Sequence, residues 1–167
     1  DFGQVEADPA VVNLGAFETF FAGRRPFFVE GSGNFSFSLD CNDGQCTGLF
    51  YSRRIGRPPH RFLDPPDGGY AVQPTNSTII GAAKLTGRLG RFSIGALNAI
   101  TTEERAHVAE GPIRSTSPVE PMTSYSVMRA NREFANRSRL GCMFTSTNRT
   151  PEDELRFIPE RAITGGV

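Results

Sequence analysis

The sequence predicts an all-β chain of antiparallel hairpins, and three observations favour this fold class. The chain contains 18 Gly and 12 Pro among 167 residues, which favours turns and short elements over long helices. Its second half contains paired segments of roughly ten residues that alternate in polarity and are separated by tight turns. No stretch approaches the ~18 consecutive apolar residues of a membrane-spanning helix. We therefore expect strands, joined mostly by short turns.

Composition divides the chain into two parts. Residues 1–75 hold ten of the fourteen phenylalanines and most of the prolines. This bias predicts an irregular Phe-rich segment, with a short helix within 9–21 and short strands at 35–39 and 49–55. Residues 76–167 are expected to supply the antiparallel hairpins.

The first predicted hairpin has the clearest pattern. It runs from Ile79 to Arg88, turns at Leu89-Gly90 and returns through 92–101. Each arm has the ~9–11 residues with which a tilted strand crosses a bilayer core. One face of the first arm is expected to carry Ile79, Gly81, Ala83, Leu85 and Gly87, and the other Ile80, Ala82, Lys84, Thr86 and Arg88. Since barrel walls are apolar outside and polar inside, we predict that Lys84, Thr86 and Arg88 face the lumen. The pattern of 92–101 does not assign its lipid-facing side.

The second predicted hairpin spans 123–149 and turns at 135–137. A long polar connection, 103–121, separates the two hairpins. Short turns on one side and long loops on the other are typical of outer-membrane-type β-barrels. The hairpins supply about four wall strands, fewer than the ~8 of the smallest closed barrels, so the predicted barrel is incomplete. Soluble sandwiches and lipocalin-like barrels show similar hairpins, which leaves a soluble β-rich ligand-binding module as an alternative.

Charged residues restrict the range of partners. Basic and acidic residues number 18 each, and this balance disfavours a nucleic-acid partner. One cluster of cations stands out and consists of Arg53, Arg54, Arg57 and Arg61. It can contact an anion, or it can pair internally with carboxylates, and we favour internal pairing.

The cysteines predict a small disulfide loop. Cys41 and Cys46 lie five residues apart in a turn-like stretch, without the additional Cys or His that a metal site requires. A disulfide implies an oxidising compartment, whereas two reduced thiols are the alternative. Cys142 is expected to be a small packing residue.

The sequence contains no pattern of residues that indicates a catalytic site or a cofactor site. His60 and His107 are expected in surface loops, and no nucleophile elbow of the G-x-S-x-G type occurs. Asp64, Asp67, Glu103 and Glu104 are best interpreted as solvated charges. We therefore expect no catalytic residues, no metal site and no cofactor.

Five stretches in a fixed order carry a family resemblance. They are DFGQVEADP (1–9), FETFF (17–21), RPFFVEG (25–31), LFYSRRIG (49–56) and IGAAKLTGR (80–88). Together they resemble a family of bacterial outer-membrane proteins of unassigned function. Its members usually carry an N-terminal carbohydrate-binding module of the family-nine type before a long β-barrel region.

The resemblance covers residues 1–149 and implies a place in the bacterial outer membrane. The implied partners are outer-membrane lipid, the remainder of the parent barrel, and carbohydrate bound by the N-terminal module. That module would precede residue 1 and the remaining strands would follow residue 167. Some members are described as membrane-associated hydrolases, which gives a second alternative function. The resemblance assigns no catalytic residues.

Overall fold

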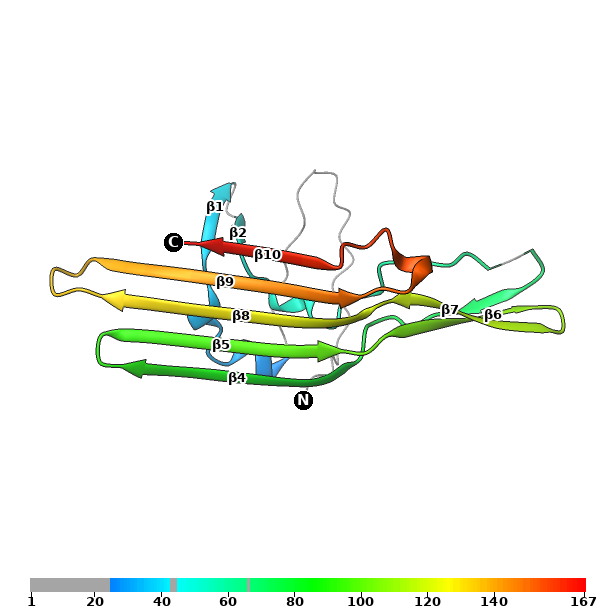
Figure 1. Ribbon diagram of the computed structural model, residues 1–167, viewed down its shortest axis with the longest axis horizontal. Helices are drawn as coiled ribbons and strands as arrows, with labels where there is room; N and C mark the ends of the chain where they lie inside the picture. The colour runs from blue at the N-terminus through cyan, green and yellow to red at the C-terminus, as the bar shows by residue number, and fades with distance from the viewer. Residues whose placement is uncertain (1–24, 43–44, 66) are drawn as a thin grey trace.

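The computed structural model describes residues 25–42, 45–65 and 67–167 (Figure 1). These residues form three antiparallel sheets of five, three and two strands. The prediction of an all-β chain of antiparallel hairpins with an irregular N-terminal segment is confirmed. The short helix expected within 9–21 lies outside the described residues. Among the described residues, no helix has the length and apolar character needed to cross a membrane.

The five-stranded sheet contains both predicted hairpins. Its strands are β4 (Ile79–Leu89), β5 (Phe92–Thr101), β8 (Met122–Glu133), β9 (Arg139–Thr150) and β10 (Arg161–Gly166). They lie in the order β10-β9-β8-β5-β4, and every neighbouring pair is antiparallel. Strand β10 is a fifth strand where four were expected. Within the described part of the chain, β4 and β10 each have one neighbour, so the sheet is open.

The connection 103–121 is a hairpin and not the expected long loop. It consists of β6 (Glu104–Glu110) and β7 (Ile113–Glu120), which continue β5 and β8 beyond the sheet (Figure 1). Strand β3 (Tyr70–Val72) pairs with the other side of β6. Pro118 is tolerated because β7 is an edge strand, where a missing N–H breaks no ladder. The prolines of this segment therefore did not exclude pairing.

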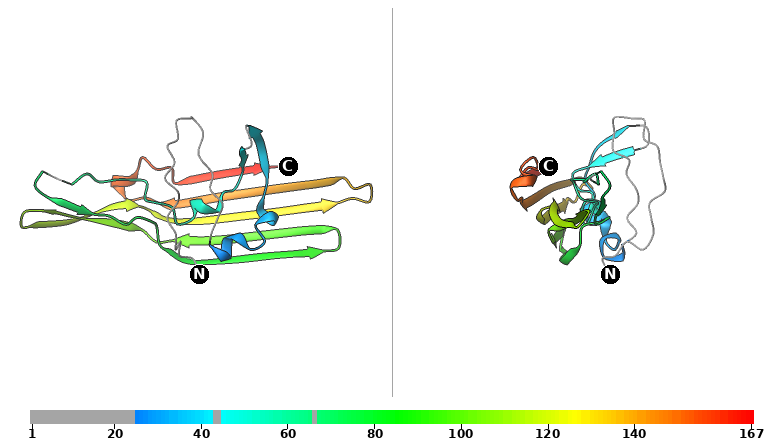
Figure 2. Two further views of the ribbon diagram at one scale, coloured as in Figure 1. Left: turned by 180° about the vertical axis from the view of Figure 1, so that it is seen from behind. Right: turned by 90° about the vertical axis from the view of Figure 1, so that its right-hand side faces the viewer.

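The N-terminal segment covers one face of the five-stranded sheet, which we call the inner face (Figure 2). Its elements are α1 (Pro26–Val29), η1 (Ser32–Phe35), β1 (Ser38–Asn42), β2 (Gln45–Gly48) and η2 (Ser52–Arg54). The prediction of a strand at 49–55 is therefore wrong, and the strand predicted at 35–39 begins only at Ser38. Phenylalanines here bury their rings against the sheet and do not alternate along a strand. The core contains Phe28, Phe35, Ile55, Leu97, Ala99, Tyr125, Val127 and Met143.

Lys84 joins β4 to the end of α1. Its Nζ donates hydrogen bonds to the carbonyl oxygens of Phe27, at 2.5 Å, and Glu30, at 2.6 Å. The ammonium also lies 4.9 Å from the centroid of the Phe27 ring. These contacts place Lys84 on the inner face. The alternation of β4 places Thr86 and Arg88 there as well.

The first residues of β4 depart from the predicted alternation. The register shifts between Ile79 and Gly81, as a β-bulge does. Ile79 consequently packs against the core with Ala82, whereas Ile80 is 61% exposed. The prediction that Ile79 shares a face with Gly81 and Leu85 is therefore wrong, because an extra residue reverses the alternation at this point.

Gly95 allows the N-terminal segment to approach β5 closely. A Cβ atom at this position would lie 3.1 Å from Cε1 of Phe35, closer than ordinary van der Waals contact. We expect Gly95→Val to lower the free energy of unfolding by roughly 1–3 kcal/mol, because overpacking displaces the ring. Urea denaturation measures the change. Gly87→Val in β4 is the control, since a Cβ there has nothing within 4 Å. Equal losses for the two variants would contradict the packing described.

Candidate functional site

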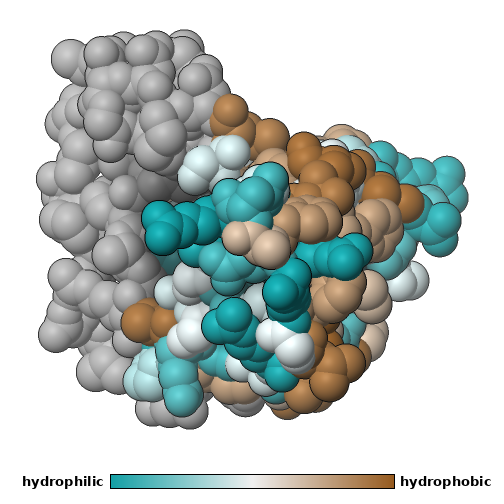
Figure 3. All heavy atoms as spheres, turned by 90° about the vertical axis from the view of Figure 1, so that its left-hand side faces the viewer, coloured by the Kyte–Doolittle hydropathy of each residue, from teal (hydrophilic) through white to brown (hydrophobic). Residues whose placement is uncertain are grey.

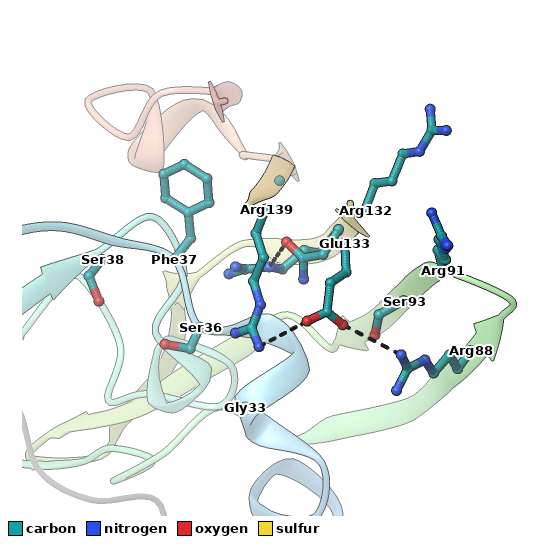
Figure 4. Close-up of a pocket in the computed structure, with 13 residues that line it drawn as sticks. Gly33, Ser36, Phe37, Ser38, Arg88, Arg91, Ser93, Arg132, Glu133 and Arg139 are labelled. Carbon is teal, nitrogen blue, oxygen red and sulfur yellow. Dashed lines mark hydrogen bonds and ion pairs between the residues drawn. The ribbon is translucent and has the colours of Figure 1, made fainter. Parts of the chain in front are cut away.

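A cavity of about 580 Å³ lies at the end of the sheet that carries the two hairpin turns (Figure 4). The ends of β4, β5, β8 and β9 form one side of it, and residues 33–38 of the N-terminal segment form the other. Five of its lining residues are arginines and one is a glutamate: Arg88, Arg91, Arg129, Arg132, Arg139 and Glu133. We call this cavity the arginine-lined pocket.

Arg129 is the most enclosed of these cations. Its Nε donates to Oδ1 of Asn131 at 3.2 Å, and its guanidinium lies 5.4 Å from the centroid of the Phe37 ring. Its Nη1 is buried and has no hydrogen-bond partner among the described residues. A buried charged donor without an acceptor is costly and uncommon.

Gly141 makes the contact between Asn131 and Arg129 possible. Gly141 and Asn131 are register partners on β9 and β8. A Cβ atom on Gly141 would lie 2.3 Å from Oδ1 of Asn131, a separation that real atoms do not adopt. The glycine therefore leaves the space into which the amide extends to orient Arg129.

Glu133 partly neutralises the mouth of the pocket. Its Oε2 lies 3.5 Å from Nη2 of Arg88, and its Oε1 lies 3.5 Å from Nη2 of Arg139. Both arginines are largely exposed, and contacts of this length between exposed groups contribute little to stability. Arg88 and Arg139 are therefore free to exchange this carboxylate for another anion.

The two remaining arginines differ in their surroundings. The guanidinium of Arg132 lies 5.1 Å from the ring centroid of Phe92 and 4.9 Å from that of Phe134, and its side chain extends away from the pocket (Figure 4). Arg91 is exposed in the β4–β5 turn. Serine hydroxyls from both sides, those of Ser36, Ser38 and Ser93, complete the lining. The pocket carries an excess of positive charge and suits an oxyanion.

Sequence reasoning named only Arg88 among these cations. A signal was nevertheless present, because Arg88, Arg91, Arg132 and Arg139 all lie within a few residues of the two hairpin turns. The pairing of β5 with β8 brings the two turns to the same end of the sheet. At that end the pairing joins Phe92 to Arg132, which are 40 positions apart in the sequence, and local pattern alone does not specify it.

The predicted cluster of Arg53, Arg54, Arg57 and Arg61 lies elsewhere. Arg61 Nη1 donates to Oγ of Ser117 at 2.9 Å and lies 2.5 Å from Oε2 of Glu154. Arg54 and Arg57 line a smaller cavity of about 150 Å³ beside Tyr125 and Arg149. Arg53 lies with Arg54 in η2. Arg61 thus forms an ion pair, but Glu154 is 53% exposed, so internal pairing of the cluster stays a prediction.

Cys41 and Cys46 are register partners in the β1–β2 pair. Directly opposed residues of antiparallel strands have Cα atoms about 4.5–5.5 Å apart, within the 4.4–6.8 Å range of disulfides. Their side chains lie outside the described residues, so the disulfide stays a prediction. Cys142 is free and exposed, so the expectation of a small packing residue is wrong.

His60 lies in a loop, as expected, but its side chain is only 20% exposed. Its backbone N–H donates to Oε2 of Glu120 at 2.8 Å, and its Nδ1 lies 2.5 Å from the same oxygen. Glu120 is almost fully buried. His107 lies in β6 and not in a loop. Among the described residues, no group of three or more His, Cys, Asp or Glu is arranged to hold a metal ion.

Glu154 connects η3 (Asp153–Leu155) to β7. The Ser117 hydroxyl donates to its Oε2 at 2.6 Å, and this hydrogen bond, with that from Arg61, holds the pKa of the carboxyl below its ordinary value.

A depressed carboxyl pKa stabilises the folded chain above the ordinary value of ~4.3, and the effect disappears as the pH falls through the folded-state pKa. We therefore expect Glu154→Gln to lower the free energy of unfolding at pH 7 and to have progressively less effect on acidification below about pH 4. Denaturation of both proteins across this pH range measures the difference. Glu110→Gln removes an equal charge at the exposed end of β6 and serves as the control. A constant difference across the range would contradict the assignment.

Comparison with known proteins gives one result. A family model described as "Domain of unknown function (DUF5916)" matches residues 1–156. No curated protein and no solved structure matches the chain.

Proposed function

The chain belongs to the family described as a domain of unknown function (DUF5916), and on that premise we propose that it forms part of a β-barrel wall in the bacterial outer membrane. Its partners in this role are outer-membrane lipid and the remaining strands of the parent protein. The proposal extends to a parent that binds or takes up carbohydrate at the cell surface, as the resemblance described above implies.

The observation that carries the proposal is the difference between the two faces of the five-stranded sheet. The inner face is covered by the N-terminal segment. On the opposite face, which we call the outer face, large apolar side chains are exposed, with Leu85 66% and Met128 60% accessible. Others are Leu89, Phe92, Ile94, Leu140, Phe144 and Ile163. Soluble monomers rarely expose such a contiguous apolar surface.

The outer face changes character along the strands. Leu85, Ala96, Met128 and Phe144 form one row across four neighbouring strands. Further from the hairpin turns, Asn98 donates to the Ser126 hydroxyl at 2.8 Å, and Arg161 donates to Asn148 at 3.0 Å. An apolar band bordered by polar groups is the pattern of a lipid-facing barrel wall. Figure 3 looks onto the turn end and shows apolar residues along the margin of a polar centre.

Strand length and edge structure agree with the proposal. Strands β4, β5, β8 and β9 have 11, 10, 12 and 12 residues, respectively. A tilted strand needs ~9–11 to cross a bilayer core. Unpaired backbone groups at a sheet edge are not tolerated in lipid. Strands β4 and β10, which have one neighbour each among the described residues, would therefore pair with further strands of the parent.

The inner face suits a filled or wet barrel interior. Lys84, Arg88 and Arg129 all lie on it, and each charged group meets a carbonyl, a carboxylate, an amide or an aromatic ring. Interiors of outer-membrane barrels are polar and are often plugged by a segment of the same chain. We assign this role to the N-terminal segment, with Lys84, Thr86 and Arg88 facing the lumen.

We expect the chain to reach a defined size with β-structure only in the presence of detergent. The exposed outer face and the open strand edges should cause self-association in plain buffer. Far-UV circular dichroism and sedimentation, each with and without a mild detergent, measure this dependence. A monomeric, cooperatively unfolding β-protein in plain buffer would favour the soluble ligand-binding module instead.

A charge on the outer face should be costly only within the apolar band. We expect Met128→Arg to destabilise the protein folded in a lipid bilayer by roughly 2–4 kcal/mol, because the charge enters hydrocarbon. Ser124→Arg, on the same strand and face but in the polar region, should cost about 0–1 kcal/mol. Denaturant titrations in vesicles measure both values. Similar costs at the two positions would contradict a lipid-facing band.

A further inference from the structure

We propose that the arginine-lined pocket binds the phosphate group of an anionic solute. Phosphate binding is inferred from contacts within this chain, whereas the choice of a solute over a lipid headgroup rests on the proposed function. It goes beyond the proposed role as a barrel wall, since a wall segment requires no such pocket.

Arg129 has an unused donor. Its Nε is bound by Asn131 and its plane faces the Phe37 ring, so the guanidinium is held in one orientation. Its Nη1 is buried without an acceptor among the described residues. The Arg129 side chain lines the pocket, so an anion bound there would offset its buried charge, and hydrogen bonds with an ionised partner are about twice as strong as neutral ones. The enclosed cation therefore favours an anionic ligand with oxygen acceptors.

The surrounding groups favour phosphate over a single carboxylate. Arg88 and Arg139 line the same pocket, and their contacts with Glu133 are 3.5 Å long; Arg88 Nε also donates to the Gly90 carbonyl at 3.3 Å. They can turn towards a second or third anionic oxygen, because a guanidinium offers several donors in one plane. The hydroxyls of Ser36 and Ser93 line the same space and can donate to a tetrahedral anion. A phosphate group carries enough charge and oxygen atoms to use these donors together.

The size of the pocket indicates a ligand larger than free phosphate. Its volume of about 580 Å³ lies within the ~300–1,000 Å³ typical of small-molecule sites. The pocket opens on the inner face, whereas the apolar surface suited to lipid lies on the other side of the sheet. This placement favours a phosphorylated solute over the headgroup of a membrane lipid.

The experiment measures binding of inorganic phosphate to the chain by phosphorus NMR line broadening, in the detergent that gives a circular dichroism spectrum of folded β-structure. We expect saturable binding by the original protein. Arg129→Gln should weaken it about tenfold or more, since it removes a charged donor. Arg129→Lys keeps the charge but loses the planar guanidinium, so its affinity for phosphate should lie between those of the original protein and Arg129→Gln.

Arg156→Gln is the matched control. Arg156 is exposed, pairs with Asp153 and lies near η3, at the far end of the sheet from the turns (Figure 1). The Arg156→Gln substitution removes the same charge as Arg129→Gln and should change the affinity for phosphate by less than about twofold. Equal weakening by Arg129→Gln and Arg156→Gln would show attraction by net charge alone and would overturn the proposal. A folded protein that binds no phosphate would also overturn it.

A second arm distinguishes the source of the phosphate group. Phosphatidylglycerol is added to zwitterionic micelles that contain the protein and inorganic phosphate. We expect no displacement of inorganic phosphate, because the pocket faces away from the lipid-suited surface. If the lipid displaces inorganic phosphate from the original protein but not from Arg129→Gln, the pocket binds a lipid headgroup. That result would overturn the proposal of a solute ligand. Folding only in detergent together with absent phosphate binding would contradict this inference and leave the barrel proposal intact.

Discussion

Burial of the inner face of the five-stranded sheet beneath the Phe-rich N-terminal segment is the interaction on which the rest of the structure depends. Phe28 and Phe35 pack against Leu97 and Val127, residues of the two central strands. Full burial of a side chain of this size contributes roughly 1.5–3 kcal/mol. In the core cluster, the residues that pack against these strands come from the N-terminal segment, so this segment provides the main apolar contacts of the inner face.

That single packing event gives the two faces of the sheet opposite roles. Side chains alternate along a strand, so the residues between those that face the N-terminal segment project to the outer face. There the sequence places Leu85, Met128 and Phe144, with nothing in the described structure to cover them. Exposure of these apolar side chains to water is unfavourable, whereas contact with lipid removes that cost.

Polar groups on the inner face are organised by the same segment. Lys84 binds two of its carbonyl groups, and Arg129 stacks on Phe37. The N-terminal segment thus serves as the hydrophobic cover for the middle of the sheet and as one wall of the arginine-lined pocket at its end. The pocket and the core share this cover, so a ligand that binds Arg129 would also stabilise the docked segment.

The sequence by itself determined the two hairpins and the polar face that carries Lys84, Thr86 and Arg88, because tight turns and period-two alternation are local properties. It placed the first turn one residue early, since the turn residues are Gly90 and Arg91. It did not predict the β6–β7 hairpin, because the prolines of 103–121 favour a loop until Pro118 is known to lie on an edge strand. It also directed attention to Arg53, Arg54, Arg57 and Arg61, which are close in sequence. Only the tertiary structure brought Arg129, Arg88 and Arg139 together, because the pairing of β5 with β8 and the docking of residues 33–38 are long-range contacts that no local pattern encodes.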